Sequence, residues 1–279
     1  MDLLDRYFDV GSVILHANLR GSQGPVVILL HGVTANLAVW EPIAISLAED
    51  LIVVALDQRG HGKSSKPGHG YEGEDFSKDL INLVESEFLN TKVYLVGHSL
   101  GARNALLAGL ARPDLFAGVV AIDFTPYIEN EVFDSLAKRV GDGNSNFESI
   151  DSIIGYLANR YPLMPRVAVE RRAASGYELS NGSYRPLASA EAMFQTVRGL
   201  RDSLVPALQG LEIPTLLVRG KISKLVSSSA IEKTKKLRPD IEVIEIEDVD
   251  HYVQEEAPDK IVEIVRNFIF STQLLDSSK

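Results

Sequence analysis

A serine within a G-x-S-x-G pattern is the residue of this chain whose surroundings most clearly indicate chemistry. Ser99 is the centre of Gly97–Gly101, which follows an apolar run and precedes a stretch of small residues that predicts a helix. A sharp strand-to-helix turn strains the residue at its apex, so flanking glycines are needed. The context predicts a nucleophilic serine at a helix N-terminus, where backbone N–H groups favour developing negative charge. A purely structural glycine-rich turn is the alternative.

His251 is the histidine that best fits the general base for this serine. It follows the last predicted strand and precedes the predicted C-terminal helix, in the segment 248–253. In enzymes with this serine turn, the base comes last along the chain, in a loop that reaches back to the nucleophile. A histidine in a surface loop is the alternative interpretation.

The acid that should orient the base is displaced from its usual position. It normally follows the next-to-last strand, but there Lys224 stands where an aspartate is expected. A lysine cannot accept the imidazole N–H or stabilise an imidazolium. Asp123 ends the strand after the serine turn, and neighbouring strand ends lie about 5 Å apart, so we expect Asp123 to be the acid. Asp248 and Asp250 are rivals, although residues so near the histidine more often cap a turn.

Two backbone N–H groups are expected to stabilise the oxyanion. The first is that of Leu100, directly after the serine, and the second comes from the turn after an early strand, where we expect Val33 with Thr34 as the alternative. The glycine-rich segment 57–65 resembles a family motif, and we interpret it as a structural turn beside the site. Trp40, the single tryptophan, fits either the pocket lining or the core.

Strand-like apolar runs alternate with amphipathic stretches along the chain, which predicts an α/β protein. We expect a mostly parallel eight-stranded sheet flanked by helices. The strands are expected in a hairpin at 8–19 and at 26–30, 51–56, 93–96, 119–122, 215–218 and 241–246, with helices at 37–49, 75–88, 102–111 and 258–270.

Strand signals stop between residue 126 and about residue 203. The pattern there is helical, broken at Gly141–Asn144, Tyr161-Pro162 and Asn181-Gly182. We therefore expect a core domain made of residues 1–125 and 204–279, and a helical cap of residues 126–203 inserted after the sixth strand.

Composition narrows the classes of function. The net charge of −10 over 279 residues argues against binding nucleic acid or an anionic membrane. The absence of cysteine excludes thiolate catalysis and cysteine metal sites. Because the sequence has no H-E-x-x-H, Walker-type or G-x-G-x-x-G motif, we expect no metal and no cofactor. Without a leader or an apolar run near ~18 residues, the chain is expected to be cytoplasmic. The sequence gives no basis for predicting an oligomeric state.

Four motifs spread over essentially the whole chain resemble the α/β-hydrolase family: His31-Gly32, Asp57-x-Arg59-Gly60-x-Gly62-x-Ser64, Gly97-x-Ser99-x-Gly101 and the late His251. Five segments resemble, within it, the enzymes that hydrolyse 2-(acetamidomethylene)succinate in bacterial vitamin B6 degradation: Gly97–Ala105, Ala121–Glu129, Arg185–Ser189, Ser223–Ser227 and Asp250–Val253. The resemblance implies a cofactor-independent serine hydrolase with the triad Ser99, Asp123 and His251. It also implies cleavage of an amide (enamide) C–N bond that releases acetate, while the rest breaks down to succinic semialdehyde, ammonia and carbon dioxide.

A small dicarboxylate substrate would need local positive charge in this acidic chain. Eight of the nine basic residues in the expected cap are arginines, which suit bidentate carboxylate recognition. By the resemblance, Arg139 and Arg160 match the carboxylate-binding arginines, and a solvated helix face is the alternative. His251 would either deprotonate Ser99 or act with it to activate water.

Other functions remain compatible with the same motifs. The fold also supports ester, lactone and carbon–carbon bond hydrolysis, and a hydrolase-like ligand receptor is a different class again. The two arginines discriminate between them. They converge on the cavity above Ser99 if the substrate is dianionic, and they face solvent if it is a neutral ester.

Overall fold

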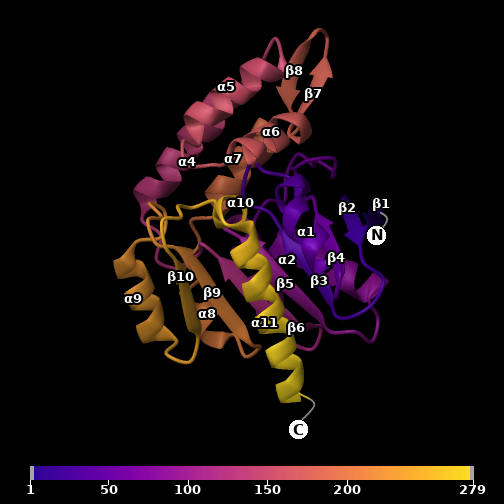
Figure 1. Cartoon of the computed structure of the whole chain (residues 1–279), viewed down its shortest axis with the longest axis vertical. Coiled ribbons are helices and arrows are strands. Elements are labelled where there is room, and N and C mark those ends of the chain that lie inside the picture. Colours follow the sequence, from indigo (N-terminus) through magenta and orange to yellow (C-terminus); the bar gives the residue numbers. More distant parts are fainter. Residues whose placement is uncertain (1–2, 277–279) are drawn as a thin grey trace.

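Eight strands form one twisted sheet that runs through the molecule, with helices on both faces (Figure 1). The computed structural model describes residues 3–276. The strand order is β1-β2-β4-β3-β5-β6-β9-β10, and every pairing is parallel except β1 with β2 and β2 with β4. The predicted sheet is therefore confirmed. Its strands are β1 (Leu4–Asp9), β2 (Ile14–Arg20), β3 (Val26–Leu30), β4 (Ile52–Leu56), β5 (Val93–His98), β6 (Phe116–Ile122), β9 (Thr215–Gly220) and β10 (Glu242–Ile246).

Each face of the sheet has its own hydrophobic core because strand side chains alternate between the faces. Val27 and Leu29 of β3 pack with helices α1 and α11, whereas Ile28 and Leu30 of the same strand pack with α2, α3 and α8. All four are fully buried. The covering helices are α1 (Glu41–Leu47), α2 (Gly73–Glu87), α3 (Leu100–Ala111), α8 (Val205–Gly210) and α11 (Pro258–Asp276), and the remaining core elements are η1 (Leu37–Trp40), α9 (Ser228–Leu237) and α10 (Val253–Glu256).

The helix predicted over residues 37–49 is divided into two pieces. It begins as the 3₁₀ turn η1, capped by Asn36, whose side chain accepts a hydrogen bond from the Ala38 N–H. The α-helical part, α1, carries Pro42 in its first turn, where the missing N–H has no helical partner to lose. Trp40 lies at the junction, is fully buried and packs in the core.

The segment 126–203 forms a separate layer over the carboxyl ends of the strands (Figure 1). It contains α4 (Asn130–Gly143), α5 (Ile150–Arg160), α6 (Arg166–Ser175), β7 (Tyr177–Ser180), β8 (Ser183–Pro186) and α7 (Ala190–Gly199). The expectation of a purely helical insertion is wrong at β7 and β8, which form an antiparallel hairpin. Its turn, Asn181-Gly182, has positive φ at both residues, the conformation that this dipeptide favours between strands.

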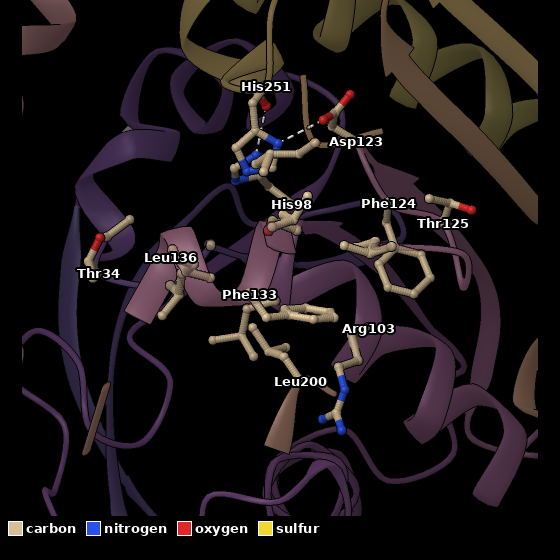
Figure 2. A pocket seen from close by; sticks show the side chains of 18 of the residues that line it. Thr34, His98, Arg103, Asp123, Phe124, Thr125, Phe133, Leu136, Leu200 and His251 are labelled. Atoms are coloured by element: carbon tan, nitrogen blue, oxygen red, sulfur yellow. Dashed lines mark hydrogen bonds and ion pairs between the residues drawn. The ribbon is translucent and has the colours of Figure 1, made fainter. Parts of the chain in front are cut away.

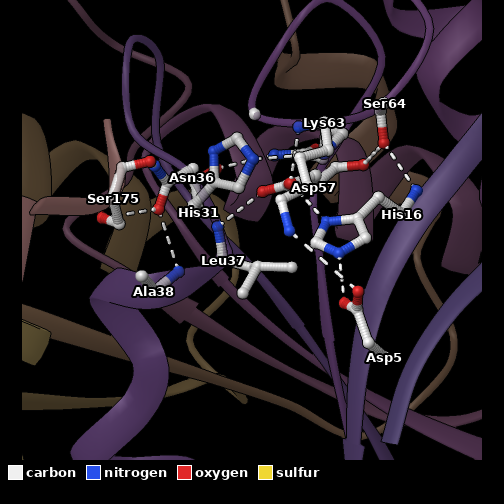
Figure 3. Close-up of polar contacts among 12 residues, drawn as sticks. Asp5, His16, His31, Asn36, Leu37, Ala38, Asp57, Lys63, Ser64 and Ser175 are labelled. Atoms are coloured by element: carbon white, nitrogen blue, oxygen red, sulfur yellow. Dashed lines mark hydrogen bonds and ion pairs between the residues drawn. The ribbon is translucent and has the colours of Figure 1, made fainter. Parts of the chain in front are cut away.

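The glycine-rich segment 57–65 is held in place by buried hydrogen bonds (Figure 3). Asp57 accepts hydrogen bonds from the Leu37 and Lys63 N–H groups, at 2.7 and 2.9 Å, and from Nδ1 of His16 at 2.7 Å. The other ring nitrogen of His16 lies 2.5 Å from Asp5. Burial lowers the pKa of His16, but the two carboxylates outweigh it, so that this pKa is raised. These contacts give Asp57 a structural role.

None of the helices within residues 3–276 is long and apolar enough to cross a membrane.

Candidate active site

The turn between β5 and α3 presents Ser99 in a strained backbone conformation. Its φ of 52° and ψ of −109° lie outside the regions that residues with side chains ordinarily occupy. A Cβ atom added to Gly97 would overlap the backbone of Gly101, and one on Gly101 would overlap the backbone of Leu30. A Cβ on Gly32 would lie 2.7 Å from the ring of His98, so the turn after β3 closely approaches this apex. The glycines are therefore required sterically.

His251 and Asp123 lie side by side above this turn (Figure 2). Nδ1 of His251 is 2.7 Å from Oδ2 of Asp123. The carboxylate accepts two more hydrogen bonds, from the Ser223 hydroxyl at 2.6 Å and from the Gly220 N–H at 3.1 Å. Three donors thus fix its orientation at the end of β6.

The loop after β9 supplies hydrogen-bond donors to the site in place of a carboxylate. It contains Lys224 where an aspartate is expected, and the Lys224 side chain is exposed. What the loop supplies instead are the donors Gly220 and Ser223, which hold Asp123 from the neighbouring strand. Asp250 accepts the Lys224 N–H at 3.2 Å. Sequence reasoning missed Ser223, although the loss of the carboxylate from this loop was a signal that it serves another purpose.

His98 supports the histidine from beneath. Burial holds the pKa of His98 well below its usual value, so the ring is neutral, and its Nε2 donates to the His251 carbonyl oxygen at 2.8 Å. The two rings lie 4.5 Å apart. Burial also lowers the pKa of His251, and the Arg139 and Arg172 charges lower it further while Asp250 opposes them. The His251 imidazole is therefore neutral at pH 7, the state that a general base requires.

Burial acts on Asp123 in the opposite sense. It raises the pKa of this carboxyl, and the hydrogen bonds from Ser223 and Gly220 together with the Arg219 charge oppose that effect. Because these donors, like the Nδ1–H of His251, satisfy the charged form, they favour a carboxylate over a carboxylic acid.

A cavity of about 230 Å³ brings most of the predicted site residues together: Val33, Thr34, Ser99, Leu100, Asp123, Arg139, Arg160 and His251 all line it. Ser99 and His251 line this cavity together, and within the described residues no hydrogen bond joins the Ser99 hydroxyl to the imidazole. The N–H groups of Val33, Thr34 and Leu100 donate to no other described residue, so each is available to an oxyanion. Over residues 3–276, no three histidine or acidic side chains are grouped closely enough to hold a metal ion.

Arg139 and Arg160 enter the cavity from the insertion, on α4 and α5. Nη2 of Arg139 donates to the Tyr252 hydroxyl at 3.1 Å. Arg160 donates to the Tyr156 hydroxyl at 2.7 Å and to the Arg139 carbonyl oxygen at 2.8 Å. Neither guanidinium forms an ion pair with a carboxylate of the described chain. The cavity therefore contains two cations without an acidic partner.

Arg172, which sequence reasoning missed, completes this end of the cavity. Its guanidinium lies 4.9 Å from the ring centroids of both Tyr161 and Tyr252, and it forms a buried ion pair with Glu255. Tyr161 directly follows Arg160, and Tyr252 directly follows His251. This adjacency to predicted site residues was a signal in the sequence for the two tyrosines. Arg172 itself lies twelve residues beyond Arg160, and no spacing rule indicated it.

Comparison with known proteins adds a family and close relatives. The family model described as alpha/beta hydrolase fold matches residues 25–258. A 2-(acetamidomethylene)succinate hydrolase of Mesorhizobium japonicum is 47% identical over 266 residues, which is 95% of each chain. The crystal structure of E-2-(acetamidomethylene)succinate hydrolase matches with a TM-score of 0.93 and 47% identity over 96% of this chain and 99% of that one. A thioesterase domain from the curacin biosynthetic pathway, 21% identical with a TM-score of 0.82 over 95% and 99% of the two chains, shares the fold alone.

Proposed function

Because this chain belongs to the alpha/beta hydrolase fold family, we propose that it hydrolyses the enamide C–N bond of 2-(acetamidomethylene)succinate, a small dicarboxylate. The observation that carries the proposal is the 47% identity to a hydrolase of that name across 95% of both chains. The cavity supports it independently, because Ser99 and His251 share it with two arginines that lack acidic partners. A dianionic substrate would supply the missing negative charge.

The proposed reaction begins with Ser99. His251, neutral at pH 7, takes the hydroxyl proton while the serine oxygen attacks the acetyl carbonyl. The N–H groups of Leu100 and Val33 stabilise the oxyanion, each contributing about 3 kcal/mol in comparable sites. Asp123 keeps the imidazole in the tautomer that accepts this proton and stabilises the imidazolium. The C–N bond then breaks, and the imidazolium returns its proton to the leaving nitrogen.

Water completes the proposed reaction in two places. One water molecule hydrolyses the acetyl-serine, which releases acetate and restores Ser99. A second adds to the enamine left behind, which loses ammonia and carbon dioxide to give succinic semialdehyde. The four products contain all atoms of the substrate and the two water molecules, and no oxidant or reductant is consumed.

We propose that Arg139 and Arg160 bind the two carboxylates. Arg172 is a poorer candidate because its charge is already neutralised by Glu255. A guanidinium that has only phenol and carbonyl partners can exchange them for a carboxylate with a large gain in electrostatic energy. The phenol contacts of both arginines hold them in place before the substrate arrives.

We further propose that residues 126–203 are a cap on a core formed by residues 1–125 and 204–279. The triad residues and both oxyanion donors come from the core, whereas both arginines come from α4 and α5 of the insertion. This division assigns bond cleavage to the core and substrate choice to the cap.

The test is acetate release from 2-(acetamidomethylene)succinate by the wild type and by Arg139→Ala. We expect kcat/KM to fall about 10- to 100-fold in the variant, because one charge-assisted interaction with the substrate is lost. Arg166→Ala is the matched control, since that arginine is exposed on α6 and pairs with Glu170 on the surface. If the wild type releases no acetate but hydrolyses a neutral short-chain ester, the substrate assignment is wrong.

A further inference from the structure

The active-site cavity has two chemically different ends. One end carries Arg139 and Arg160 with their tyrosine partners, and these arginines also line a smaller adjoining cavity of about 80 Å³. The other end, here called the apolar lobe, is lined by six large side chains that do not reach the smaller cavity: Phe124, Phe133, Leu136, Leu200, Leu204 and Leu225. Figure 2 shows four of them, Phe124, Phe133, Leu136 and Leu200, gathered below the His251–Asp123 pair.

The spacing of residues along helix α4 gives the distance between the two ends of the cavity. Phe133, Leu136 and Arg139 recur at intervals of three residues and line the same cavity, so they lie along one face of the helix. At 1.5 Å per residue, Phe133 and Arg139 are about 9 Å apart along the helix axis. A ligand that reaches both must be extended, with a charged end and an apolar end.

Most polar groups around the apolar lobe are held by partners within the protein. The Thr125 hydroxyl pairs with the Thr234 hydroxyl at 2.9 Å. Arg103, whose Nε has no partner, donates from Nη2 to the Gly199 carbonyl oxygen at 2.5 Å and lies 3.5 Å from Asp202. At the rim, Arg201 pairs with Asp134. The surface offered to a ligand here is mainly aromatic and aliphatic, and its nearby cations already have acidic partners.

We propose that the apolar lobe is a site for acyl chains longer than acetyl, so that the enzyme also hydrolyses N-propanoyl and N-butanoyl counterparts of the enamide. This inference rests on the proposed function: with the carboxylates at Arg139 and Arg160, the acyl group lies on the other side of the scissile bond. An acetyl group ends in one methyl, which can cover only a small part of the surface that these six side chains present to the cavity. The reaction is unchanged: water adds across the C–N bond, the longer acid leaves as its carboxylate, and the nitrogen takes the proton.

A series of N-acyl substrates tests the proposal. We expect kcat/KM to increase from acetyl through propanoyl to butanoyl, by about fourfold for each methylene that becomes buried. An N-succinyl substrate, which places a carboxylate at similar chain length, should be at least tenfold poorer than the butanoyl one. A kcat/KM that stays level or falls from acetyl to butanoyl would overturn the proposal.

A variant of the apolar lobe tests whether the longer acyl chains bind there. Leu200→Phe narrows the apolar lobe, and we expect the butanoyl-to-acetyl ratio of kcat/KM to fall at least tenfold. Leu163→Phe makes the same change on the exposed cap surface, away from the cavity, and should keep the wild-type ratio. An unchanged ratio in Leu200→Phe would place the acyl chain elsewhere. Acetate release without butanoyl hydrolysis would contradict this inference alone, whereas no acetate release would contradict the proposed function itself.

Discussion

At the residue scale, the environment of His251 determines the protonation state of its imidazole before reaction. The ring is buried, receives support from His98 below, and points one nitrogen at Asp123. Burial and the two neighbouring arginines, Arg139 and Arg172, disfavour the imidazolium before reaction. Proton uptake by His251 is therefore favourable only when negative charge develops beside it, which is the condition that the proposed attack by Ser99 would meet.

The pH dependence of the reaction follows from this environment. Because the pKa of His251 is lowered from 6.5, the neutral base persists as the pH falls below that value, and activity is lost only at the lowered pKa. Burial lowers the pKa of His251 to about 3, so we expect kcat/KM to keep its value from pH 8 down through pH 6.5 and to fall only as the pH approaches that lowered pKa, in a profile measured from about pH 3 to 8. Asp250→Asn should move the limb further down, since Asp250 raises this pKa. A midpoint at or above 6.5 would contradict the account.

Individual site residues could be predicted from the sequence where a local rule applied, and their roles stay predictions. Ser99 was indicated by its flanking glycines, and Asp123 by the lysine that occupies the usual acid position. Ser223 and Arg172 were missed because their roles depend on contacts across 100 and 83 residues, with Asp123 and Glu255 respectively. No pattern within one element carries information about such a pair.

At the element scale, Arg172 connects α6 of the insertion to α10 of the core. Its ion pair with Glu255 is buried, and the Tyr161 and Tyr252 rings enclose the guanidinium. Tyr252 is adjacent to His251 and hydrogen-bonded to Arg139, so the same cluster touches the loop that carries His251 and the proposed carboxylate site. Packing of the insertion and geometry of the site are thus coupled through one side chain.

Breaking this pair should be costly. We expect Arg172→Met to lower the free energy of unfolding by about 3 to 5 kcal/mol, because Glu255 would be left buried without a counter-ion. Urea denaturation measures the loss. The double variant Arg172→Met/Glu255→Leu removes both charges and should recover most of the stability. If the double variant is less stable than the single one, the desolvation argument does not hold.

Element boundaries were predictable where side-chain periodicity was strong. The buried strands and the terminal helix appear close to their expected positions, because alternating or helical apolar patterns reflect the core directly. The β7–β8 hairpin was missed because its residues are exposed or half-buried, so no apolar alternation marked it. The Asn181-Gly182 turn signal was present but was interpreted as a break between helices.

At the scale of the whole molecule, the sheet topology explains how the proposed acid, Asp123, can lie on a different strand from the usual one. β6 lies between β5, which ends at the Ser99 turn, and β9, whose following loop usually supplies the acid in this family. The carboxyl ends of these three parallel strands meet at one edge. A carboxylate at the end of β6 therefore reaches His251 as readily as one after β9, and the vacated loop is free to hold it. The family resemblance inferred from the motifs is confirmed by the family match over residues 25–258.

The most direct test of the account is the rate of acetate release by Asp123→Asn. We expect the variant to fold with unchanged circular dichroism and to lose about 10⁴ in kcat, because an amide stabilises the wrong imidazole tautomer. Asp250→Asn, which alters the rival carboxylate beside the same histidine, should remain within a few-fold of wild type at pH 7. Full activity in Asp123→Asn, or a loss confined to Asp250→Asn, would contradict the assignment of the acid.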